Sequence, residues 1–160
     1  MKSYCEIEEL RELFKDYMIS KESNLTEKEY KLFCSWLQYL PKEIIGRILS
    51  DIYFCLLSYE NHDAACYIPL HTPYMAKKKG IIVIPQALFG CAIDMPGKEN
   101  VEKKFLHEVA HFICCHTGRE NPPQAEIIEL EANILTDRWM LDYSVPNTAD
   151  GTVVEEMGEN

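Results

Sequence analysis

The sequence has no apolar run approaching the roughly 20 residues needed to cross a bilayer, and it has no CxxC pair. Its start, MKSYCEIEELRE, is acidic and lacks the apolar core of a signal peptide, so we expect a protein that is not exported. The seven cysteines are irregularly spaced, which indicates reduced thiols in a cytoplasmic protein rather than a disulfide framework. No internal repeat or low-complexity segment is present. We therefore expect an ordinary globular protein without a membrane anchor.

Basic residues are scarce. The chain has 16 Lys and Arg against 26 Asp and Glu, which gives a net charge of −10. Proteins that bind the nucleic-acid backbone usually display clustered Lys and Arg, so direct nucleic-acid binding is not expected. The length of 160 residues and an apolar content of 47% are typical of one soluble domain with a real core.

The first part of the chain has the patterns of helices. Residues 5–19 form an amphipathic pattern, and Thr26 with Glu29 three positions later predicts a helix that begins with a capping box. Pro41 suits the first position of a third helix, which we expect to run over residues 41–59, PKEIIGRILSDIYFCLLSY.

The second part combines strands and helices. ACYIPL (65–70) and GIIVIP (80–85) are short, rich in β-branched or aromatic residues and bounded by Pro and Gly, which predicts strands. A helix carrying KKFLHEVAHFICCH (103–116) should end near Gly118, and a last helix is expected at about 123–143. The predicted fold is α+β in a single domain over residues 1–145, with a helical part (1–57), a part that combines strands and helices (58–145) and a flexible acidic tail (146–160).

Within that helix, HEVAH places His107 and His111 four residues apart with Glu108 beside the first. On a helix the two imidazoles lie about 40° apart on one face and can share a metal ion. Glu108, displaced by about 100° from His107, flanks such an ion and suits a general base. The rest of the helix is apolar nearly all round, which indicates burial, and buried polar groups need partners. We therefore predict a metal site here.

A catalytic zinc usually has three protein ligands, so a third must come from elsewhere. If the helix continues to Gly118, His116 points about 140° away from His111, and we expect a structural role for it near the helix C-terminus. Glu131 shares a face with charged residues and is expected on the solvent side. Glu129 lies in the middle of a face that we expect to be buried, and it is the predicted third ligand.

Two further residues of the last helix complete this hypothesis. Asn133, one turn after Glu129, could hydrogen-bond a ligand from the second shell of the site. Glu126 is a reserve ligand, although a glutamate in the first turn of a helix is more simply explained by the helix dipole.

HEVAHFICCH and ELEAN (129–133) resemble the paired motifs of the ImmA/IrrE metallopeptidases, a gluzincin-type family of zincins. The resemblance covers residues 58–145. It implies a zincin-like fold with a small, mainly antiparallel sheet, Zn²⁺ bound by His107, His111 and Glu129, and Glu108 as general base. It also implies an intracellular endopeptidase acting on a protein or peptide, such as a transcriptional repressor. By the same resemblance GIIVIP (80–85) is a candidate for the edge strand that holds the substrate, although an ordinary core strand explains this segment at least as well.

The oxyanion donor is left open among four residues: Tyr67, His71, Tyr74 and Tyr143. Mn or Fe could replace zinc in a site of two His and one Glu. An alternative function is a catalytically silent binding or regulatory protein of a phage or mobile element, although Glu108 speaks against it. A third option is a peptide-deformylase-like enzyme with Cys91 as ligand, but Leu106 stands before His107 where glutamine is expected.

Overall fold

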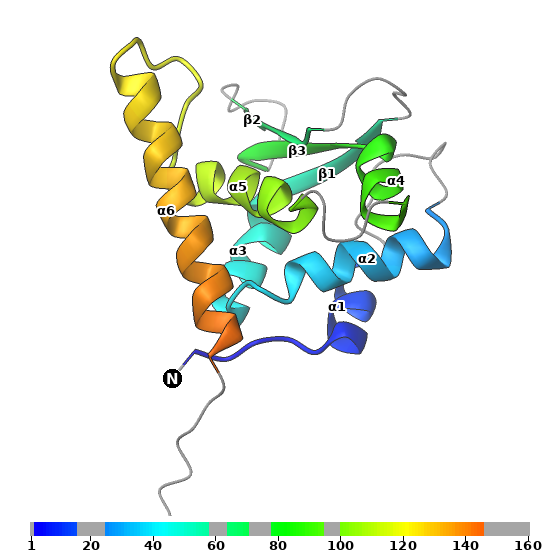
Figure 1. The fold of residues 1–160 in the computed structure, drawn as a ribbon. Helices are drawn as coiled ribbons and strands as arrows, with labels where there is room; N and C mark the ends of the chain where they lie inside the picture. Colours follow the sequence, from blue (N-terminus) through cyan, green and yellow to red (C-terminus); the bar gives the residue numbers. More distant parts are fainter. Residues whose placement is uncertain (1, 16–24, 58–63, 71–77, 95–99, 146–160) are drawn as a thin grey trace, which may run out of the picture.

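The described part of the chain begins with three helices, continues with a small sheet and one short helix, and ends with two longer helices (Figure 1). The computed structural model describes residues 2–15, 25–57, 64–70, 78–94 and 100–145. Over these residues the predicted α+β class is confirmed. The elements are α1 (Ile7–Phe14), α2 (Glu27–Leu37), α3 (Lys42–Asp51), β1 (Ile52–Leu57), β2 (Cys66–Pro69), β3 (Gly80–Pro85), α4 (Gln86–Asp94), α5 (Val101–Ile113) and α6 (Gln124–Ser144).

The described sheet has three strands in the order β1-β3-β2, and it is mixed. β1 runs parallel to β3, from Ile52 opposite Gly80 to Leu57 opposite Pro85. β2 runs antiparallel to β3, from Cys66 opposite Val83 to Pro69 opposite Gly80. The expectation of a mainly antiparallel sheet is therefore wrong. GIIVIP forms β3, the central strand of the described sheet, so the edge-strand candidate is wrong and the alternative of an ordinary core strand is confirmed.

The predicted third helix is also wrong in its second half. α3 ends at Asp51, and Ile52 adopts an extended backbone with φ −120° and ψ 141°. In β1 the residues Ile52, Phe54 and Leu56 are buried, while Tyr53 and Cys55 are partly exposed. Every residue of this segment is apolar, so the alternation that marks a strand is hidden in the sequence. A short apolar run of this kind fits a buried strand as well as a helix.

The other predicted elements are present, with shifted ends. α1 lies inside the predicted 5–19, of which residues 16–19 fall outside the described part of the chain. Thr26 caps α2, because its side-chain oxygen accepts a hydrogen bond from the N–H of Glu29 at 3.2 Å. Pro41 precedes α3 as its N-cap residue. α4 was not predicted, and the acidic tail (146–160) lies outside the described residues.

An aromatic cluster lies at the centre of the core, where α5 packs on the sheet and against α2. The rings of Phe33 and Phe54 meet edge to face with centroids 5.1 Å apart, and Phe105 of α5 lies 5.7 Å from Phe33. Trp36 stacks on Phe89 of α4 at 5.0 Å. These rings are at most 2% exposed. The helix that carries the two histidines is therefore anchored from several sides.

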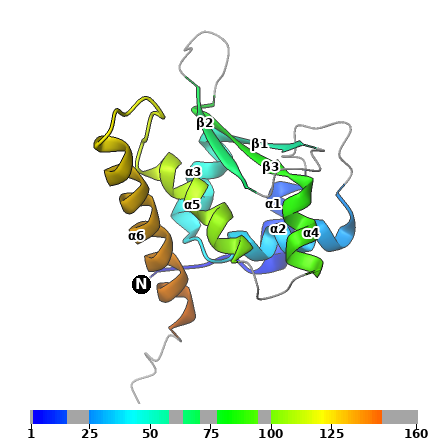
Figure 2. The same ribbon diagram turned by 45° about the horizontal axis from the view of Figure 1, so that its top comes forward.

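α6 flanks the molecule on one side of α5 (Figures 1 and 2). Its C-terminal end lies beside the N-terminal segment, where Lys2 forms an ion pair with Asp142 and the ring of Tyr143 packs on Tyr4 and Tyr39. Even with its 21 residues, α6 is not apolar enough to cross a bilayer, and neither is any other described helix.

Candidate metal centre

The two histidines of α5 lie side by side. Asn100 caps this helix, and residues such as Phe105 and Val109 bury its apolar side against the sheet and α2. Because one turn separates His107 from His111, their rings meet edge to face with centroids 4.5 Å apart. Their Nε2 atoms are 2.9 Å apart. The predicted pairing of the imidazoles is thus present in the folded chain.

The carboxylate of Glu129 reaches the same point from α6. Its Oε2 lies 3.0 Å from His107 Nε2, and its Oε1 lies 3.4 Å from His111 Nε2. The expectation that Glu129 lies in the middle of a buried face is wrong, because 59% of its side chain is exposed. α6 lies at the margin of the molecule and buries only a narrow stripe, formed by Ala132, Thr136 and Trp139.

This donor set fits a divalent cation. Ligand atoms about 2.0–2.1 Å from a tetrahedral zinc lie about 3.3–3.4 Å from one another. The three distances among His107 Nε2, His111 Nε2 and the nearest oxygens of Glu129 are 2.9, 3.0 and 3.4 Å. Burial and the neighbouring imidazole lower the pKa of His111, which favours the neutral ring that binds metals. The residues present could therefore hold a zinc ion with an open fourth position.

The carboxylate of Glu108 also lies close to the two imidazoles. One of its carboxylate oxygens lies within 4.8 Å of a nitrogen on each ring. Its Oε2 accepts a hydrogen bond from the backbone N–H of Tyr67 in β2, at 2.7 Å. Burial raises the pKa of Glu108, and the hydrogen bond from Tyr67 partly opposes that rise. A partly buried carboxylate of raised pKa, held against a strand, is suited to accept a proton.

His116 is placed differently from the expectation. α5 ends at Ile113, not near Gly118, and Cys115 takes a left-handed backbone with φ 59°. The N–H of Cys115 then bonds to Phe112 O at 3.1 Å, and the N–H of His116 bonds to His111 O at 3.0 Å. These two bonds form a Schellman motif, which commonly places glycine where Cys115 stands. The turn brings His116 back against His111 instead of pointing it away.

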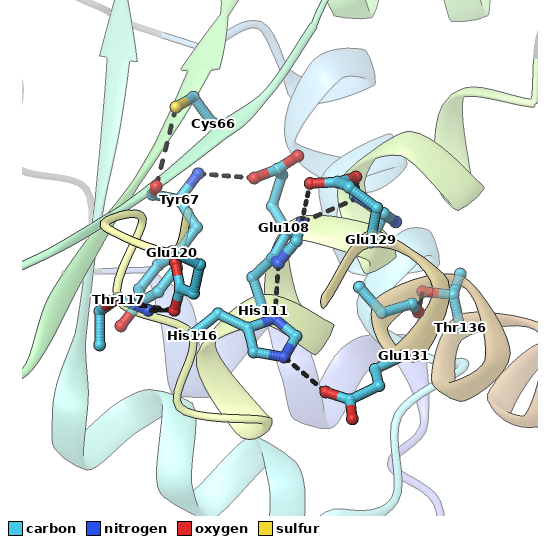
Figure 3. A network of polar contacts seen from close by, with 12 residues as sticks. Cys66, Tyr67, Glu108, His111, His116, Thr117, Glu120, Glu129, Glu131 and Thr136 are labelled. Carbon is cyan, nitrogen blue, oxygen red and sulfur yellow. Dashed lines mark hydrogen bonds and ion pairs between the residues drawn. The ribbon is translucent and has the colours of Figure 1, made fainter. Parts of the chain in front are cut away.

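Glu131 is the partner of His116. His116 Nδ1 lies 2.8 Å from His111 Nδ1, and His116 Nε2 lies 3.0 Å from Glu131 Oε2 (Figure 3). The expected solvent position of Glu131 is therefore only half right, because its side chain is 55% exposed yet contacts a buried ring. Helical geometry alone could not reveal this pair, since it depends on where α5 stops.

The strained turn gives a prediction. A left-handed backbone costs a non-glycine residue about 1–2 kcal/mol. Cys115→Gly removes this cost, although the freer unfolded chain offsets about 0.4–1 kcal/mol of the gain. We expect the free energy of unfolding to rise by up to about 1 kcal/mol in urea titrations. Cys114→Gly is the control, because Cys114 has an ordinary helical φ of −76° and its replacement should destabilise the protein. Equal destabilisation by both variants would contradict the turn geometry.

A scan against models of protein families, a search of curated proteins and a search of solved structures each gave no match to this chain. The resemblance to the ImmA/IrrE metallopeptidases therefore stays a prediction. What can be said of function rests on the residues of this chain and their arrangement.

The remaining candidates lie at different distances from the centre. Asn133 lines a cleft beside Glu129, but no hydrogen bond from its side chain is among the contacts of the described residues. Glu126 is exposed on the first turn of α6 and lines neither cleft at the centre. Cys91 lies in α4, and among the described residues it is not one of the side chains that come together at the centre, where Glu108 lies close to His107 and His111.

The four candidate oxyanion donors lie in different parts of the chain relative to the metal centre. Tyr143 lies 14 residues, or about 21 Å, along α6 from Glu129 and contacts other tyrosines, so it is not at the centre. Tyr67 packs its ring against Phe112 and over Gly80. Gly80 accepts this contact only because it has no side chain, since a Cβ there would lie 2.4 Å from the Tyr67 ring. His71 and Tyr74 lie outside the described residues.

Two clefts open on either side of the centre, and both are lined by His107, Glu108 and Glu129. One, of about 300 Å³, extends past Tyr67 and Pro69 of β2. The other, of about 470 Å³, extends past Ala65 and Lys103. The sequence did not reveal the part that β2 plays, because its contact with Glu108 is made by a backbone N–H group.

Proposed function

We propose that this protein is a zinc-dependent endopeptidase. The observation that carries the proposal is the convergence of His107, His111 and Glu129 within 2.9–3.4 Å of one another, with the separate carboxylate of Glu108 alongside. Two imidazoles and one carboxylate are a ligand set of catalytic zinc sites, and such sites keep one position open for water or substrate. A structural zinc site needs neither the open position nor a neighbouring base, so Glu108 favours catalysis over a purely structural ion.

In this proposal each residue has one task. His107, His111 and Glu129 would hold the zinc, which when bound would supply Lewis acidity and a nucleophilic water at neutral pH. Glu108 takes a proton from the attacking water and passes it to the nitrogen of the scissile amide, which then leaves as an amine. The N–H of Tyr67 orients the Glu108 carboxylate for both transfers.

In the described sheet, β2 is an edge strand, and its edge away from β3 supports a peptide as the substrate. The N–H of Leu70 bonds to Lys79 O at 2.9 Å, so the even-numbered residues of β2 direct their backbone groups towards β3. Tyr67 and Pro69 therefore direct theirs away from the sheet, and Tyr67 does so at the centre itself. Because Pro69 has no N–H and the N–H of Tyr67 already donates to Glu108, an extended peptide at this edge would donate its own N–H groups to the backbone oxygens of Tyr67 and Pro69. The proposed substrate class is a protein or peptide, for example a transcriptional repressor.

Elemental analysis tests the proposal. The purified protein should contain about one zinc per chain, and a His107→Ala variant should contain none, because removal of one of three ligands leaves an incomplete site. Glu102→Gln is a matched control that alters the same helix away from the imidazoles and should keep the metal. Equal zinc content in the His107→Ala variant and the unmodified protein would contradict the proposed centre. A different bound metal would change the cofactor but not the site.

A further inference from the structure

A continuous chain of polar contacts connects the surface of α6 to His111. The Glu131 carboxylate lies 3.0 Å from His116 Nε2, and His116 Nδ1 lies 2.8 Å from His111 Nδ1. The other nitrogen of His111, Nε2, is the one that faces His107 and Glu129. His116 is only 7% exposed, so water cannot easily replace these partners. The position of each ring is therefore set by its neighbour.

The chemistry of Glu131 sets the direction of these hydrogen bonds. An ionised carboxylate can only accept, so His116 Nε2 must carry the hydrogen that it donates to Glu131. In a neutral imidazole the other nitrogen is then an acceptor, so His116 Nδ1 accepts from His111 Nδ1. His111 consequently carries its hydrogen on Nδ1. Its Nε2 presents a lone pair towards His107 and Glu129.

We propose that Glu131 and His116 are positioning residues that hold His111 in the tautomer whose Nε2 atom can bind a metal. A histidine ligand usually donates its second ring nitrogen to a carboxylate or carbonyl, and this contact fixes both its tautomer and its orientation. In this chain a second histidine stands between the ligand and the carboxylate. Neither positioning residue is one of the three proposed metal ligands.

The fold assembles this arrangement from two local features. The left-handed turn at Cys115 returns His116 to the end of α5, as its bond to His111 O shows. On α6, Ala132 is fully buried and its small side chain allows close packing against α5. Glu129 and Glu131 lie on opposite sides of Ala132, about 60° and 100° away around the helix. Glu129 therefore reaches Nε2 of His111 directly, whereas Glu131 is connected to Nδ1 of the same ring through His116 (Figure 3).

The first test is independent of metal. In metal-free protein labelled with ¹⁵N-histidine, long-range ¹H–¹⁵N correlation spectra report which nitrogen of each ring carries the hydrogen. We expect His111 to be protonated on Nδ1 in the unmodified protein and to become a mixture of tautomers in Glu131→Ala. Glu131→Gln should retain most of the Nδ1 form, because the amide oxygen can still accept from His116. Glu126→Ala, which removes another exposed carboxylate of α6, should leave the tautomer unchanged.

The second test measures zinc affinity by competition with a chromophoric chelator, and this part rests on the proposed function. Glu131→Ala should weaken zinc binding by about tenfold or more relative to Glu126→Ala, as expected when an outer partner of a ligand is lost. Glu131→Gln should bind nearly as tightly as the unmodified protein. An unchanged His111 tautomer in Glu131→Ala overturns the inference, whatever the affinity. If the unmodified protein binds no zinc, the proposed function fails, while the spectra still decide the tautomer.

Discussion

Replacing Glu108 by glutamine should lower the rate of peptide cleavage by the zinc-loaded protein by about 10²–10⁴-fold, the usual contribution of a general base. Glutamine has the same shape, and its amide oxygen can still accept the hydrogen bond from Tyr67, which is 2.7 Å long. It cannot take a proton from water. The three metal-ligand candidates are untouched, so the zinc content should stay at one per chain. Cleavage can be followed by mass spectrometry as new termini in a peptide library.

The same substitution should stabilise the metal-free protein. Burial raises the pKa of Glu108, which means that the folded state disfavours the carboxylate. Above the pKa of an unfolded glutamate, about 4.3, the ionised group therefore destabilises the fold. Glutamine has no charge to bury, so the midpoint of urea unfolding at neutral pH should rise. The difference in stability between Glu108→Gln and the unmodified protein should vanish as the pH falls below about 4.3, because Glu108 is then protonated in both the folded and the unfolded state.

Glu102→Gln is the matched control, because it removes the same charge from the first turn of α5. It should leave cleavage unchanged. If Glu108→Gln cleaves peptides as fast as the unmodified protein, Glu108 is not the base. If neither the unmodified protein nor Glu102→Gln cleaves any peptide although both bind zinc, the alternative of a catalytically silent binding protein is favoured.

The part of the candidate metal centre that lies on a single helix could be predicted from the sequence. A separation of four residues fixes the relation of His107 to His111, and nothing elsewhere in the fold can change it. Glu129 was found because a polar residue among apolar neighbours suggested a buried face. That reasoning named a residue that does reach the imidazoles, yet the face is largely exposed. Side-chain pattern alone could not tell a fully buried helix from one at the margin of the molecule.

Features that depend on where an element ends were missed. His116 was expected to point away because α5 was extended to Gly118, and a left-handed turn without glycine leaves no sequence signal. β1 was assigned to a helix because all six of its residues are apolar. Once β1 pairs with β3, the central position of β3 follows, and β2 becomes the strand beside Glu108. The positions of β2 and β3 in the sheet are therefore decided by pairing between segments that lie far apart in the sequence.

Phe105→Ala should lower the free energy of unfolding by about 3–5 kcal/mol, which is a large part of the roughly 5–15 kcal/mol typical of a domain. Phe105 is fully buried two residues before His107. Its ring lies 5.6 Å from Trp36 and 6.0 Å from Phe54, so its removal leaves a cavity between α2, β1 and α5. Urea unfolding of the metal-free protein, followed by tryptophan fluorescence, measures the change.

Two further variants separate the cavity from a general effect of substitution. Phe105→Leu keeps much of the volume and should cost less than half as much as Phe105→Ala. Leu141→Ala removes a side chain that is 64% exposed on α6 and should change stability by no more than about 0.5 kcal/mol. If zinc binds only the folded chain, saturating zinc should raise the unfolding midpoint of all three variants, because none of them changes a ligand. A Phe105→Ala variant as stable as Leu141→Ala would mean that α5 is not anchored through this ring, and the placing of both histidines would need another cause.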